Sequence, residues 1–122
     1  KTEKQMARLL GTNKVKGTWE KDFPRLAEKY KLQYVVEHKG SIKDLKKFYR
    51  EGYGIIVCFH LPKENKDHYS VLKKIDSKEI HLLDPWSGPD KFYPINYFKK
   101  IWKTVSEKDL RWFIALKKKV ED

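Results

Sequence analysis

Cysteine is almost absent from this sequence, with only Cys58 in 122 residues. A single thiol cannot form an internal disulfide, and it does not fix the redox compartment or the localisation. No apolar run approaches the roughly 18 residues of a membrane-spanning helix, and no signal-peptide core is present. The chain starts with Lys rather than Met, so we expect it to be processed, cropped or only partly represented.

Arginine is also scarce, although the chain is strongly basic. Lys and Arg number 28 against 17 Asp and Glu, which gives a net charge of +11. The few arginines are Arg8, Arg25, Arg50 and Arg111. Nucleic-acid readers usually rely on arginine for phosphates and base edges, so this balance favours a solvated lysine surface. A basic module that binds nucleic acid or another anionic surface remains the alternative function.

The order of the helix and strand signals predicts an α+β fold, with N-terminal helices packed on an antiparallel sheet. We expect one domain over residues 1–122, without internal repeats. Expected helices cover Thr2 to Leu10, Thr18 or Asp22 to about Tyr30, Ser41 to Gly52, and Pro94 to about Lys103. Expected strands outside the hairpin described next are Leu32 to Glu37, Gly54 to Leu61, Lys91 to Tyr93 and Arg111 to Lys117.

The stretch from Asp67 to Pro89 predicts a β-hairpin with His68 near one end and Asp84 near the other. If Ser77 and Lys78 form a two-residue turn, residue 75 faces residue 80, and the two side chains lie on opposite faces. If Asp76 to Lys78 form a three-residue loop, residue 70 faces residue 84. His68 and Asp84 then share a face as diagonal neighbours, roughly 7–8 Å apart at Cα. The sequence permits both registers.

This hairpin resembles the His and Asp strands of the C39-like peptidases, a branch of the papain-like cysteine peptidases. The similar segments are DHYSVLKKID and IHLLDPWSGP, and the flanking similar segments are KQMARLLGTNKVKGTW, SIKDLKKFYREGYGIIVCFHL and PINYFKKIW. The resemblance implies a papain-like α+β domain that cleaves or binds peptides without a cofactor. It implies His68 as the base and Asp84 as the residue that orients it. Trp86 and Asp67 are candidate substrate-binding residues beside this pair.

The family's nucleophile has no counterpart in this sequence. In the family a Gln precedes an Asp-Cys-Gly-like motif on a first helix, whereas this chain starts at what resembles the second helix. Gln5 is followed six residues later by Gly11, not by Cys. As it stands the chain is expected to be catalytically silent. Either the nucleophile lies on an upstream segment, or the chain is a degenerate relative that only binds peptides.

The missing helix also bears on assembly. In papain-like domains the nucleophile helix fills the middle of the core, and we expect Ile55, Val57, Phe59 and Ile114 to have apolar surface to bury. An upstream helix, a second copy of the chain or a partner helix is therefore expected to cover the sheet.

Cys58 is a poor substitute for the missing nucleophile. It alternates with Val57 and Phe59 in an apolar run, where a cysteine behaves as a small hydrophobic residue, so we expect it to be buried. The remaining histidines, His38, His60 and His81, make no spacing that indicates a metal site, and no metal is expected.

Overall fold

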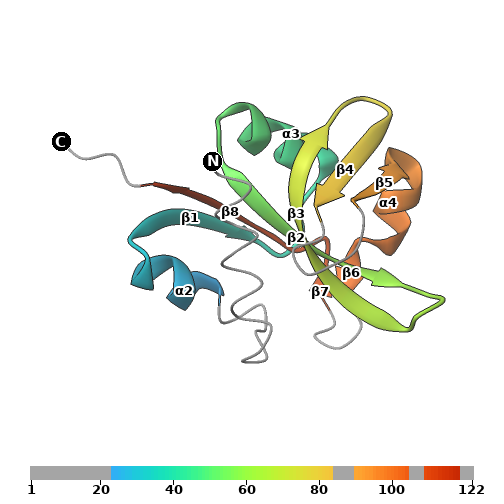
Figure 1. Cartoon of the computed structure of the whole chain (residues 1–122), viewed down its shortest axis with the longest axis horizontal. Coiled ribbons are helices and arrows are strands. Elements are labelled where there is room, and N and C mark those ends of the chain that lie inside the picture. Colours follow the sequence, from blue (N-terminus) through green and yellow to red (C-terminus); the bar gives the residue numbers. More distant parts are fainter. Residues whose placement is uncertain (1–22, 84–89, 105–108, 119–122) are drawn as a thin grey trace.

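The structure is a computed structural model that describes residues 23–83, 90–104 and 109–118. Its strands form one six-stranded antiparallel sheet in the order β1-β8-β2-β3-β4-β5 and a small two-stranded sheet of β6 and β7 (Figure 1). The α+β class is therefore confirmed. The expected helix from Thr2 to Leu10 lies outside the described residues.

The elements are α2 Phe23–Lys29, β1 Leu32–Glu37, α3 Ile42–Arg50, β2 Gly54–Leu61, β3 Lys66–Ile75, β4 Glu79–Leu83, β5 Lys91–Pro94, α4 Ile95–Ile101, β6 Lys103–Thr104, β7 Asp109–Leu110 and β8 Phe113–Lys118.

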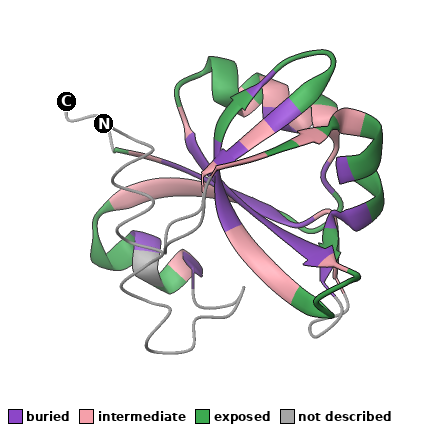
Figure 2. Ribbon diagram, turned by 45° about the vertical axis from the view of Figure 1, so that its right-hand side comes forward, coloured by how far each residue is buried: buried purple, intermediate pink, exposed green. Residues whose placement is uncertain are grey.

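Strand β2 lies inside the sheet and is covered on both faces (Figure 2). Successive side chains of a strand point to opposite faces, so the odd and even residues of β2 enter two separate cores. Ile55, Val57 and Phe59 pack with apolar residues of α3 and α4, on what we call the α3/α4 face. Ile56 and Cys58 pack with residues of α2, on the α2 face. The continuous apolar run of this strand is explained by burial on both sides.

Ser41 begins α3 with a capping box, as its sequence predicts. The Ser41 hydroxyl accepts a hydrogen bond from the Asp44 amide at 3.1 Å, and the Asp44 carboxylate accepts one from the Ser41 amide, also at 3.1 Å. The two bonds satisfy backbone donors that a helix otherwise leaves open. Gly52 follows the helix with φ +87°, a left-handed conformation that glycine adopts without steric cost.

The β3–β4 hairpin combines the two registers that the sequence permits. Next to the turn, Ile75 pairs with Ile80, as a two-residue turn requires. The register then shifts by one between Leu72 and Lys74, so that Leu72 pairs with Leu82 and Val71 with Leu83. Lys73 is the extra residue of this β-bulge. The turn is thus the two-residue one, whereas the pairing beyond the bulge is the one that a three-residue loop would have produced.

Other boundaries differ from the sequence-based expectations in small ways. Helix α2 is described from Phe23 to Lys29 and includes Pro24. Helix α4 ends at Ile101, and the two-residue strands β6 and β7 that follow were not predicted. None of the helices in the described ranges is long and apolar enough to span a membrane.

The four apolar residues expected to need an additional covering helix are already buried. Ile55, Val57, Phe59 and Ile114 are each 0% exposed, and Ile114 belongs to the opposite face from the other three. Ile55, Val57 and Phe59 pack in the α3/α4 core, and Ile114 packs in the α2-face core. Whether an upstream helix, a second copy of the chain or a partner helix also covers the sheet stays a prediction.

Substitutions at two glycines should separate steric crowding from backbone strain. A Cβ at Gly40 would lie 2.7 Å from the Phe113 ring and 2.9 Å from the Arg111 carbonyl oxygen. Overpacking of this kind should cost Gly40→Ala about 1–3 kcal/mol of unfolding free energy in urea. At Gly52 the space is open, so Gly52→Ala should lose about 1–2 kcal/mol through its positive φ alone.

Asparagine distinguishes the two causes, because it tolerates the left-handed region but is larger than alanine. Gly52→Asn should be more stable than Gly52→Ala, whereas Gly40→Asn should be less stable than Gly40→Ala. The same order at both positions would contradict this explanation.

Candidate functional site

His68 lies on the α3/α4 face of β3, near the β2–β3 turn. It pairs across the ladder with Phe59, and the two rings stack with centroids 5.7 Å apart and planes inclined by 19°. The Phe59 ring is fully buried beneath it, whereas 24% of the His68 side chain is exposed. The imidazole is therefore supported on one side and open to solvent on the other, as an acid–base group needs.

A carboxylate that the sequence analysis did not single out meets this imidazole. Glu64 Oε1 lies 3.1 Å from His68 Nε2. The contact depends on the turn, in which Asn65 takes a left-handed conformation with φ 50° and its amide donates to the Leu61 carbonyl at 2.9 Å. Asparagine tolerates this conformation better than most residues. The i, i+4 spacing of Glu64 and His68 across a turn was the only signal in the sequence.

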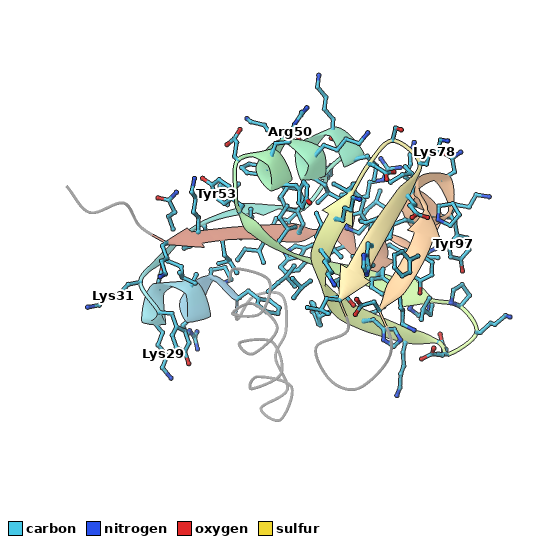
Figure 3. All side chains as sticks on the ribbon, turned by 45° about the horizontal axis from the view of Figure 1, so that its top comes forward. Lys29, Lys31, Arg50, Tyr53, Lys78 and Tyr97 are labelled. Atoms are coloured by element: carbon cyan, nitrogen blue, oxygen red, sulfur yellow. The ribbon has the colours of Figure 1, made fainter. Side chains whose placement is uncertain are left out.

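Aromatic residues from β5 and α4 continue the site beside His68. Tyr93 meets Phe59 edge-on at 5.9 Å between ring centroids, and Tyr97 lies 5.6 Å from Tyr93. Burial raises the pKa of the Tyr93 hydroxyl, and the nearby Tyr97 and Glu64 raise it further by smaller amounts. The hydroxyl therefore stays protonated at neutral pH. Tyr97 projects from α4 at the surface and is 42% exposed (Figure 3). Phe59, Tyr93 and Tyr97 thus form a row of contacting rings that starts at the ring on which His68 stacks, and we call this row the aromatic wall.

Asp84 and Trp86 lie outside the described residues. The last described residue before them is Leu83, which pairs with Val71 three residues after His68. Whether Asp84 meets His68 therefore stays a prediction, and so does the role of Trp86.

Cys58 is buried, as predicted, and lies on the wrong face of the sheet to serve His68. It is 0% exposed and pairs with Tyr69, so it belongs to the α2-face core. His68 is adjacent to Tyr69 in sequence and therefore points the opposite way. The only cysteine of the sequence cannot act as the nucleophile for this histidine.

Asp67 forms a second histidine–carboxylate pair on the α2 face. Its Oδ1 lies 2.8 Å from Nδ1 of His60, its cross-strand neighbour on β2, and the two side chains are only 13% and 10% exposed. The Asp67 carboxylate is thus engaged on the face opposite His68. A role for Asp67 in binding substrate beside His68 stays a prediction that this contact does not support.

The other two histidines also contact carboxylates. His38 Nδ1 lies 2.7 Å from Asp109 Oδ2, and His81 Nε2 lies 2.9 Å from Asp90 Oδ2. These pairs are separate from one another, and the described part of the chain contains no group of three or more His, Cys, Asp or Glu side chains that could hold a metal ion.

Comparison with known families places most of this chain in one family. The sequence model of the peptidase C39 family matches residues 2–106, which includes the helix α3, the central strand and the whole hairpin. This chain belongs to the peptidase C39 family. The papain-like α+β fold expected from the resemblance is thereby confirmed, and the chain is a cysteine peptidase-like domain. No curated protein matches the sequence significantly.

Burial of Cys58 in this C39 domain can be tested by its reactivity. In the native chain it should react slowly with a thiol reagent such as Ellman's reagent, and quickly after denaturation, because access requires the sheet to open. A Cys58→Ala/Ser77→Cys chain is the matched control, since residue 77 is exposed and its thiol should react at once. Rapid, stoichiometric labelling of native Cys58 would contradict the structure.

Proposed function

We propose that this domain supports peptide cleavage by a Cys–His–Asp arrangement in which His68 is the base and Asp84 orients it. The cysteine comes from a segment outside these 122 residues. The observation that carries the proposal is the position of His68, which stacks on Phe59 and is partly exposed on the face opposite Cys58.

The bulge at Lys73 supports Asp84 as the orienting carboxylate. Leu82 belongs to the α3/α4 core, as do Leu72 and Ile75. If the alternation and the register beyond the bulge continue by one residue, Asp84 shares this face and lies opposite Ser70. His68 would then be its diagonal neighbour, within reach of its side chain. Without the bulge, Asp84 would lie opposite Val71, and His68 would point to the opposite face of the sheet.

Each group has a defined task in such a reaction. His68 removes the proton from the thiol, and the thiolate attacks the carbonyl carbon of the peptide. The C–N bond breaks, the amine leaves with the proton from His68, and water then hydrolyses the acyl-enzyme. A carboxylate at the second ring nitrogen fixes the tautomer and stabilises the imidazolium.

Glu64 is a second carboxylate within reach of the same ring, so the proposal assigns it a subsidiary role. It is 52% exposed and stands on a turn, where solvent weakens its interaction with His68. Its contact holds the imidazole towards the turn. Asp84 follows Leu83, the last residue of β4, and the register of that strand favours it as the orienting residue.

Substrate contact is assigned to the aromatic wall. Tyr93 packs against Phe59, Tyr97 packs against Tyr93, and Trp86 follows Asp84 by two residues in the sequence. Trp86 is proposed to extend this wall along a bound peptide. Asp67 is not included, because its carboxylate bonds His60 on the other face.

The proposal predicts distinct effects of substitution in the protein with its nucleophile segment. His68→Ala should lower kcat/KM for peptide cleavage by about 10³-fold or more, and Asp84→Asn by about 10²–10⁴-fold. Glu64→Gln, which makes the same change from carboxylate to amide, should have a much smaller effect. Cys58→Ala should retain full activity.

Several outcomes would contradict these assignments. Full activity of His68→Ala would contradict its assignment as the base. Loss of activity in a folded Cys58→Ala chain would contradict the assignment of the nucleophile to another cysteine. A larger effect of Glu64→Gln than of Asp84→Asn would transfer the orienting role to Glu64.

The coding sequence upstream of Lys1 separates cleavage from binding alone. A Gln followed about six residues later by Cys-Gly supports the enzyme, and its absence supports a degenerate domain that binds peptides. If the chain instead binds nucleic acid with a steep salt dependence that His68→Ala does not change, the alternative reading as a basic module is favoured.

A further inference from the structure

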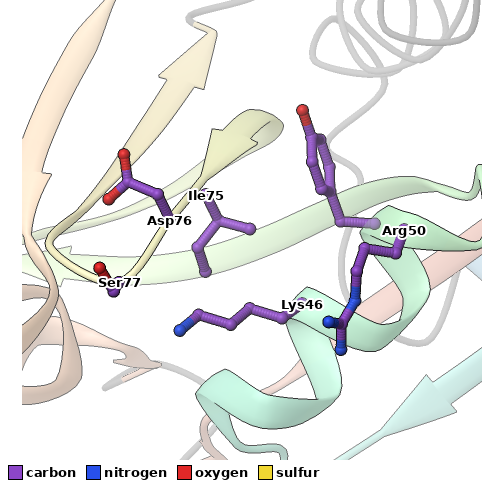
Figure 4. A pocket seen from close by; sticks show the side chains of 6 residues that line it. Lys46, Arg50, Ile75, Asp76 and Ser77 are labelled. Atoms are coloured by element: carbon purple, nitrogen blue, oxygen red, sulfur yellow. The ribbon is translucent and has the colours of Figure 1, made fainter.

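A pocket separate from the His68 site lies between α3 and the β3–β4 turn (Figure 4). Its volume is about 240 Å³, and its lining residues are Lys46, Tyr49, Arg50, Ile75, Asp76 and Ser77. Ile75 and His68 stand at opposite ends of β3, seven residues apart, which corresponds to roughly 20 Å along a strand. A ligand in this pocket would not contact the imidazole.

Two cations on one side of α3 line the pocket. Lys46 and Arg50 are four residues apart, so they are neighbours on the helix surface. Figure 4 shows the Lys46 side chain reaching from α3 towards the turn that carries Ser77, with Arg50 next to it on the same helix. No ion pair joins either cation to another described residue. Like charges at this spacing repel one another, and a bound anion would remove that cost.

The one carboxylate of the pocket is engaged by the turn. Asp76 Oδ1 accepts the Lys78 amide at 2.8 Å and the Glu79 amide at 2.9 Å. These bonds, that of Glu79 first, lower the pKa of Asp76, so it is ionised at neutral pH. Attraction to the nearby Lys46 also lowers the pKa of Asp76. The single negative charge of Asp76 therefore faces two positive charges in the lining of the pocket.

The remaining lining groups define the rest of a ligand. The hydroxyls of Tyr49 and Ser77 are donors that complement the two cations. Ile75 is 7% exposed and adds an apolar surface, as does the Tyr49 ring. A tetrahedral phosphate, with several equivalent oxygens, can use donors from a helix and a turn at once, whereas a carboxylate has two oxygens.

We propose that this pocket binds a small phosphate monoester, with the phosphate between Lys46, Arg50 and Ser77 and an apolar group against Ile75 and Tyr49. The proposal does not depend on the peptidase activity, since the pocket lies at the end of β3 opposite to His68.

Phenyl phosphate is a suitable probe, titrated into the ¹⁵N-labelled chain at fixed ionic strength while the amide signals of Ser77 and Lys78 are followed. Lys46→Ala and Arg50→Ala should each weaken binding by about tenfold, the loss expected for one charge-assisted hydrogen bond. Lys43→Ala is the matched control, because Lys43 is an exposed cation of α3 that does not line the pocket. The Lys43→Ala chain should bind phenyl phosphate as tightly as the wild type does.

Asp76→Asn tests the site in the opposite direction. The amide oxygen can still accept both turn amides, but the negative charge is gone, so phenyl phosphate should bind several-fold more tightly. Inorganic phosphate and benzoate should both bind more weakly than phenyl phosphate, since one lacks the ring and the other the tetrahedral head.

A general attraction to a chain of net charge +11 would give a different pattern. Equal losses in Lys43→Ala and Lys46→Ala would overturn the proposal, and so would unchanged affinity in Asp76→Asn. Tighter binding of benzoate than of phenyl phosphate would overturn the assignment to phosphate.

Discussion

The β-bulge at Lys73 determines which face of the sheet each residue of the central hairpin reaches. Leu72 and Ile75 are three residues apart and would point to opposite faces in a regular strand, yet both belong to the α3/α4 core. The extra residue makes this possible. His68 lies an even number of residues before Leu72 and therefore shares its face. The bulge thus reconciles the apolar pattern near the turn with the position of the histidine near the other end.

The same alternation separates two histidine–carboxylate pairs that are chemically alike. His68 and Glu64 lie on the α3/α4 face, and His60 and Asp67 on the α2 face with Cys58. The second set contains all three residue types of a cysteine peptidase, but its thiol is fully buried, so a peptide substrate cannot reach it. Burial, rather than residue type, distinguishes a structural cluster from a candidate site.

Much of the fold could be predicted from local signals. The capping box at Ser41 and the apolar run of β2 each depend on a few adjacent residues, and both were predicted correctly. The bulge could not be predicted, because only the packing of Leu72 against α3 and α4 selects it. The contacts of His60 with Asp67 and of His68 with Glu64 were missed for a similar reason, since both follow from the geometry of the β2–β3 turn and ladder. The family resemblance identified His68, whereas the sequence alone left the face of Asp84 open.

The most direct test of this account is disulfide trapping of the register beyond the bulge, in a Cys58→Ala background. The account predicts that residue 84 lies opposite residue 70, where Cβ atoms are roughly 4.5–5.5 Å apart. Under mild oxidation the Ser70→Cys/Asp84→Cys chain should therefore form an internal disulfide, detected by mass spectrometry. The Val71→Cys/Asp84→Cys chain should not, because its side chains point to opposite faces. Efficient trapping of the second pair and not of the first would show that Asp84 lies on the α2 face, away from His68, and would contradict the proposed site.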